Sequence, residues 1–122
     1  MAAFNIAFEA PESGNHPRPS GDRPIDLVHL ARQTGGDKTL ESEVLAIFAR
    51  QIRKAVRELP ALSGDARARL AHTIAGSAKG VGAFEVARCA EVVEQAPANP
   101  AAITAFTKAV VDADSFIVGL MR

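Results

Sequence analysis

Apolar side chains recur every three or four residues along most of this chain, and no window alternates in the way a strand does. This period favours α-helices that each bury one face. The clearest case lies between Asp37, a good N-cap residue, and Pro60, which cannot continue a helix. The spacing predicts a helix over about residues 38–59, with this apolar face: Leu40, Val44, Ile47, Phe48, Ile52, Ala55, Val56 and Leu59.

Turn and capping signals divide the rest of the chain into four further helical segments. They are expected at 24–34, closed by two glycines, from Ser63 to the Gly80-Val81-Gly82 break, at 83–95 and, after an Asn-Pro start, at about 100–120. Five helices with short links predict an all-α antiparallel bundle. Its apolar faces are expected to carry Leu27, Leu30, Ala31 and Thr34, then Val86, Cys89, Ala90 and Val93, then Ile103, Phe106, Val110, Ile117 and Leu120.

Composition restricts the classes of protein to which the chain can belong. Its 122 residues fit one domain, residues 25–122, and four of the seven prolines fall in residues 1–24, which are expected to be a flexible arm. Fourteen basic and fourteen acidic residues balance, which argues against nucleic-acid binding. One cysteine excludes an internal disulfide, and no apolar run suits a membrane span or a signal peptide. A cytoplasmic protein is expected, without a bound metal.

One histidine has unusual neighbours for a helix surface. In the third predicted helix Ala66, Leu70, Ile74, Ser77 and Val81 share one arc, and His72 falls nearly opposite. The positions three and four residues from His72 are Ala68, Arg69, Ala75 and Gly76. An interior glycine lowers helix stability by roughly 1 kcal/mol relative to Ala, so we expect this floor of small residues to admit a large partner.

A neutral imidazole near pH 7 can accept and release a phosphoryl group. Arg69 and Lys79 lie on the same side as His72 and could stabilise the anion. The chain shows no phosphate-cradling glycine loop and no acidic cluster for Mg²⁺, so the donor and the metal would come from a partner.

The stretch "HTIAGSAKGVGA" resembles the signature of histidine-containing phosphotransfer (Hpt) domains of bacterial multistep two-component phosphorelays. The matching residues are His72, Ile74, Gly76, Ser77, Ala78, Val81 and Gly82, and the resemblance extends over about residues 25–118. The family usually has Lys three residues after the histidine, where this chain has Ala75, and Lys79 is the candidate replacement.

The resemblance implies an up-down-up-down four-helix bundle with an additional short N-terminal helix. It implies that His72 is the phosphoacceptor. From their positions on the same helix, Lys79 and Arg69 are expected to stabilise the phosphate, and Ala68, Ala75, Gly76 and Lys79 are expected to dock the partner. The partners would be response-regulator receiver domains, and possibly a hybrid histidine kinase. The chain would be a monomer, without kinase or ATPase activity and without a cofactor of its own, the Mg²⁺ residing on the receiver.

Two other interpretations remain open. A non-catalytic helical adaptor could dock a partner through the small-residue patch around His72. An enzyme could use Cys89 with a histidine, although Cys89 lies among apolar residues and fits a core position better. His29 fits a surface role, and His16 lies in the proline-rich arm.

Overall fold

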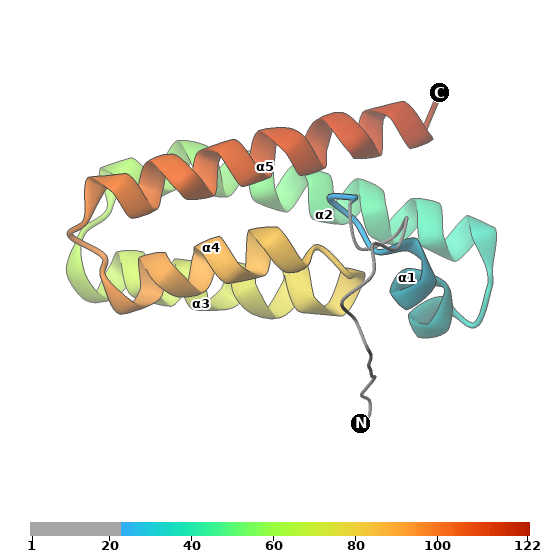
Figure 1. The fold of residues 1–122 in the computed structure, drawn as a ribbon, viewed down its shortest axis with the longest axis horizontal. Helices are drawn as coiled ribbons and strands as arrows, with labels where there is room; N and C mark the ends of the chain where they lie inside the picture. Colours follow the sequence, from blue (N-terminus) through green and yellow to red (C-terminus); the bar gives the residue numbers. More distant parts are fainter. Residues whose placement is uncertain (1–22) are drawn as a thin grey trace, which may run out of the picture.

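The computed structural model describes residues 23–122, and all regular secondary structure in that range is helical (Figure 1). This confirms the all-α class and the five predicted helices. The prediction of a flexible arm over residues 1–24 lies almost wholly outside the described residues. The helices are α1 (Leu27–Thr34), α2 (Lys38–Glu58), α3 (Gly64–Val81), α4 (Phe84–Gln95) and α5 (Pro100–Leu120), and a 3-10 turn, η1 (Leu59–Ala61), follows α2.

Side-chain caps begin three of these helices; those of Asp37 and Asn99 were predicted, and that of Asp26 was not. The carboxylates of Asp26 and Asp37 accept hydrogen bonds from the backbone of His29 and Leu40, at 3.1 and 3.0 Å. The Asn99 side chain accepts from the Ala101 amide at 3.0 Å, before α5. Such caps satisfy amide groups that have no partner inside the helix. Ser63 occupies the N-cap position of α3, but its hydroxyl makes no capping bond.

The four longer helices pack in a closed ring. Helix α2 packs on α3, α3 on α4, α4 on α5 and α5 on α2, while α1 contacts α2 and α3. In Figure 1, α3 and α4 lie side by side, α5 runs above them, and α1 lies at the end where α3 turns into α4. Arg53 of α2 donates to Asp114 of α5 at 2.9 and 2.6 Å, across the seam between the first and last of these helices. No helix in the described range is long and apolar enough to cross a bilayer.

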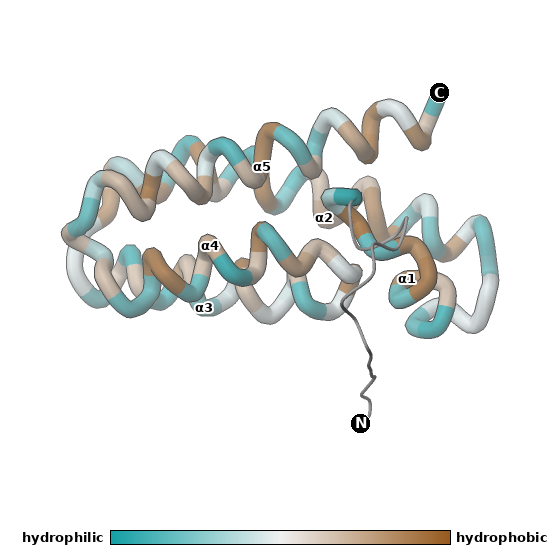
Figure 2. Tube along the Cα trace, viewed as in Figure 1, coloured by the Kyte–Doolittle hydropathy of each residue, from teal (hydrophilic) through white to brown (hydrophobic). Residues whose placement is uncertain are grey.

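The core is aliphatic, with two fully buried phenylalanines, Phe48 and Phe106. No charged or polar side chain is buried among residues 23–122. Figure 2 shows hydrophobic and hydrophilic positions alternating along the helices, as expected when each buries one face. The predicted α4 face (Val86, Cys89, Ala90 and Val93) is fully in this core, which confirms that prediction.

Three predicted core positions are wrong. Leu40 and Ile47 of α2 are 41% and 59% exposed, because the stripe that meets the other helices runs through Leu45, Phe48 and Ala49 instead. Leu40 and Ile47 lie on the side of α2 that faces away from that stripe. Leu120, at the end of α5, is 43% exposed although its helical spacing places it with the core residues.

Candidate functional site

The small residues of α3 mainly serve its contact with α4. Ala71, Ala75 and Ala78 are at most 4% exposed, and they meet an equally buried alanine row on the other side. That row is Ala83, Ala87 and Ala90. Helix axes approach closely when the side chains between them are small. The alanines of the segment therefore serve the tight packing of the two helices.

This packing corrects the predicted orientation of α3. The buried stripe is rotated toward α4 relative to the predicted arc, so Ser77 is only half-buried, and Ala75 is in the core instead of beside His72. Ala75 is consequently not an exposed docking residue. A lysine side chain at this position would start inside the α3–α4 interface.

The turn between α3 and α4 requires a glycine. Gly82 adopts the left-handed conformation with φ of 89°, and its amide bonds to the Ala78 and Lys79 carbonyls. Its own carbonyl accepts from the Asp26 amide at 2.8 Å, which ties the start of α1 to this turn. A Cβ atom on Gly82 would lie 2.8 Å from the Asp26 carbonyl oxygen.

His72 stands on the exposed side of α3 and is held by a carboxylate from α4. The Nδ1 atom of His72 lies 2.9 Å from Oε2 of Glu94, and 75% of the histidine side chain is exposed. A carboxylate only accepts hydrogen bonds, so Nδ1 carries the proton. The lone pair of the neutral ring is then on Nε2, which has no hydrogen-bond partner in the described part of the chain.

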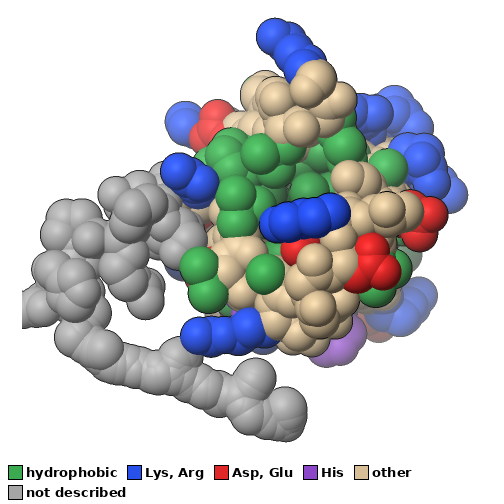
Figure 3. Space-filling view, turned by 90° about the vertical axis from the view of Figure 1, so that its right-hand side faces the viewer, with side chains coloured by type: hydrophobic (Ala, Val, Ile, Leu, Met, Phe, Trp, Pro, Cys, Tyr) green, Lys and Arg blue, Asp and Glu red, His purple; other side chains and the backbone are tan. Residues whose placement is uncertain are grey.

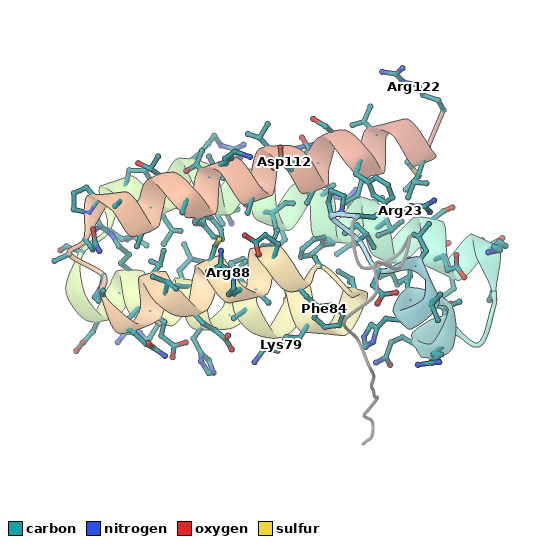
Figure 4. All side chains as sticks on the ribbon, in the orientation of Figure 1. Arg23, Lys79, Phe84, Arg88, Asp112 and Arg122 are labelled. Carbon is teal, nitrogen blue, oxygen red and sulfur yellow. The ribbon has the colours of Figure 1, made fainter. Side chains whose placement is uncertain are left out.

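A second pair joins the same two helices further along. Nζ of Lys79 lies 2.5 Å from Oε2 of Glu91, and Figure 4 shows Lys79 pointing away from the bundle on the α3 side. The pairs His72–Glu94 and Lys79–Glu91 thus form a ladder across α3 and α4. Sequence reasoning missed both glutamates, because their role depends on the register between two helices. Two glutamates three residues apart on one predicted helix were the available signal.

The remaining predicted site residues lie around His72 as follows. Arg69 and Gly76 are exposed, one turn before and one turn after the histidine, and Ala68 is half-buried. A Cβ atom added at Gly76 meets nothing within 4 Å, so the surface there is open. Arg69 makes no ion pair in the described range; its carbonyl accepts from the Thr73 hydroxyl at 3.1 Å.

Cys89, the other candidate nucleophile, and His29 lie in parts of the fold other than the His72 surface. Cys89 is 3% exposed, and burial raises the pKa of its thiol, so it is held in the protonated, unreactive form. His29 of α1 stacks edge-on against Phe84 with ring centroids 5.1 Å apart. No group of three or more potential metal ligands occurs among residues 23–122. His16 lies outside the described residues.

Fold and site together define an all-helical protein with an exposed histidine held by a carboxylate of the neighbouring helix. Comparisons of the chain with family models, with curated proteins and with solved structures give no match.

Proposed function

We propose that this chain is a phosphorelay intermediate that receives a phosphoryl group on Nε2 of His72 from a receiver-domain aspartyl phosphate and passes it to another receiver. The hydrogen bond from Nδ1 to Glu94 is the observation that carries the proposal. It leaves the second ring nitrogen unprotonated on a side chain that is 75% exposed. In this proposal α2 to α5 form an up-down-up-down four-helix bundle, with α1 across one end.

The transfer needs no general base, because the attacking nitrogen carries no proton. The Nε2 lone pair attacks phosphorus, the N–P bond forms, and the P–O bond to the partner's aspartate breaks, releasing a carboxylate. The ring keeps its Nδ1 proton and becomes a phosphoimidazolium. Glu94 faces that proton and stabilises the positive charge that develops on the ring. Return transfer to a second aspartate reverses these steps.

The surface around His72 supports docking of a folded domain. Gly76 leaves space beside the ring. Arg69 and Lys79 provide positive charge toward a phosphoryl group. Lys79 would have to exchange its contact with Glu91 for one with the phosphate. The Mg²⁺ that assists such transfers would belong to the receiver.

Phosphotransfer profiling tests the proposal directly. The chain is incubated with a set of purified, ³²P-phosphorylated receiver domains and Mg²⁺, and label on the chain is measured with time. We expect an acid-labile, alkali-stable phosphate on the wild-type chain and none on His72→Gln. His29→Gln is the matched control, because it removes a histidine at the α1 end and should leave labelling unchanged.

An adaptor without chemistry is the competing function, and the ion pair that already engages Lys79 favours it. An adaptor would bind a receiver equally well with His72→Gln and would never carry label. Labelling of His72→Gln would instead place the acceptor at another residue.

A further inference from the structure

On the side of α5 that faces the core, apolar residues continue beyond the last buried residue. Phe106, Val110 and Ile117 are buried on one side of this helix. Leu120 and Met121 follow Ile117 by three and four residues, so they lie on the same side. Both are nevertheless 43% exposed. We refer to Leu120, Met121 and the half-buried Phe116 as the end patch.

The end patch is not covered by α4, because α4 is shorter than α5. Helix α5 has 21 residues and α4 has 12, and both start or end at the turn that joins them. The last nine residues of α5, about 13 Å, therefore extend past α4, beside α2. Figure 3 looks onto this end, and hydrophobic side chains gather there below the C-terminus.

The start of the described chain lies at the same end. Ile25 is fully buried, and the Asp26 amide bonds to Gly82 in the α3–α4 turn. The Asp26–Gly82 bond therefore puts the start of α1 at the end of the bundle where α5 ends (Figure 1). A further 22 residues precede Arg23. Those residues thus connect to the body next to the end patch.

The preceding segment contains one cluster of large apolar residues, Phe4, Ile6 and Phe8. In an extended strand, alternate residues face the same side, so these three would form one apolar edge. Phe8 is fifteen residues before Arg23, a reach of up to about 50 Å. That exceeds the length of α5, about 32 Å, so the segment can return to the patch without strain.

We propose that residues 4–8 bind the end patch of their own chain, with Phe4, Ile6 and Phe8 against Phe116, Leu120 and Met121. Removing exposed apolar side chains from water is favourable, by roughly 25 cal/mol for each Å² buried. A segment tethered beside the patch has a high effective concentration and would outcompete a second molecule. This inference is independent of the proposed phosphotransfer.

Photo-cross-linking in the full chain tests this contact. The photoreactive residue p-benzoylphenylalanine replaces Phe8 in one protein and Asn5 in another, and cross-linked peptides are mapped by mass spectrometry. We expect Phe8 to cross-link to residues 116–121 of the same chain, several-fold more than Asn5, which would lie on the opposite edge. The yield should not depend on protein concentration.

A second set of variants tests the patch itself. Leu120→Ser with Met121→Ser should strongly reduce the cross-link from position 8. Val92→Ser should not, although Val92 is also an exposed apolar residue, 40% accessible on α4. Equal yields from positions 5 and 8, cross-links to other parts of the body, or cross-links between two chains would each overturn the proposal.

Discussion

At the scale of single residues, the reactivity assigned to His72 depends on a side chain from another helix. Glu94 fixes which ring nitrogen holds the proton, and thereby which one can act as nucleophile. Because the pair is exposed, it adds little to stability, about 1 kcal/mol or less. Its effect should appear in chemistry and in ring protonation instead.

Glu94→Ala should therefore lower the phosphorylation rate of His72 about fivefold, which corresponds to roughly 1 kcal/mol of activation free energy. Glu94→Gln should retain most of the rate, because the amide oxygen still accepts from Nδ1. Initial rates of labelling measure the first effect, and ¹⁵N chemical shifts of the ring report the tautomer. An unchanged tautomer in Glu94→Ala would show that Glu94 does not orient the ring.

Gly76→Leu separates partner approach from folding. The added side chain enters open space, and replacing an interior glycine should raise the free energy of unfolding by about 0.5–1 kcal/mol. Phosphotransfer should nevertheless slow strongly, because the leucine blocks the surface beside His72. Gly119→Leu is the control, since Gly119 is also helical and open but lies on α5. Transfer at the wild-type rate by Gly76→Leu would rule out docking over Gly76.

Lys79→Ala should shorten the lifetime of the phosphohistidine several-fold without abolishing transfer. Both members of the Lys79–Glu91 pair are exposed, so the contact contributes about 1 kcal/mol or less, and the effect should shrink with added salt. Lys108→Ala removes a comparable exposed pair, with Asp112 on α5, and should leave the lifetime unchanged. Equal lifetimes for the Lys79→Ala variant and wild type at low salt would assign Lys79 a surface role only.

At the scale of secondary-structure elements, the α3–α4 turn determines the register that brings the glutamates to the site. Gly82→Ala should lower the free energy of unfolding by about 2 kcal/mol, because alanine is strained at positive φ and its Cβ would press on the Asp26 carbonyl. Gly80→Ala should instead raise it slightly, since Gly80 is helical with open space around it. Urea denaturation followed by circular dichroism distinguishes the two, and equal stabilities would contradict the strain argument.

At the scale of the whole molecule, one arginine joins the loops at the end opposite α1. Arg67 donates Nε to the Leu59 carbonyl at 2.9 Å and Nη1 to Pro97 at 2.5 Å, and its Nη2 reaches the carbonyl of Leu62. It therefore links the α2–α3 connection to the α4–α5 turn. Nη2 also reaches the Pro60 carbonyl at 3.3 Å, and four carbonyls in a fixed arrangement suit the planar guanidinium group.

Arg67→Ala should lower the free energy of unfolding by about 2–4 kcal/mol, since it removes several hydrogen bonds from a charged donor at once. Arg67→Lys should restore only part of the loss, because one ammonium group cannot reach all four carbonyls. Arg57→Ala, at an exposed position of α2, should change stability by less than about 0.5 kcal/mol. The midpoint of urea denaturation provides the comparison, and full rescue by lysine would mean that charge alone matters.

The sequence alone determined the all-α class, the helix boundaries and the exposure of His72, because helical period and capping are local properties of the chain. Asp37, Asn99, Gly35 and Gly82 mark helix ends whatever lies around them. Only the tertiary structure decided which sides of the helices are covered. Ala75 is in the core, whereas Ile47 and Leu120 are exposed. Burial depends on which helices lie beside a residue and on how far those helices extend. The pairing of His72 with Glu94 likewise follows from the register of α3 against α4, which no local pattern contains.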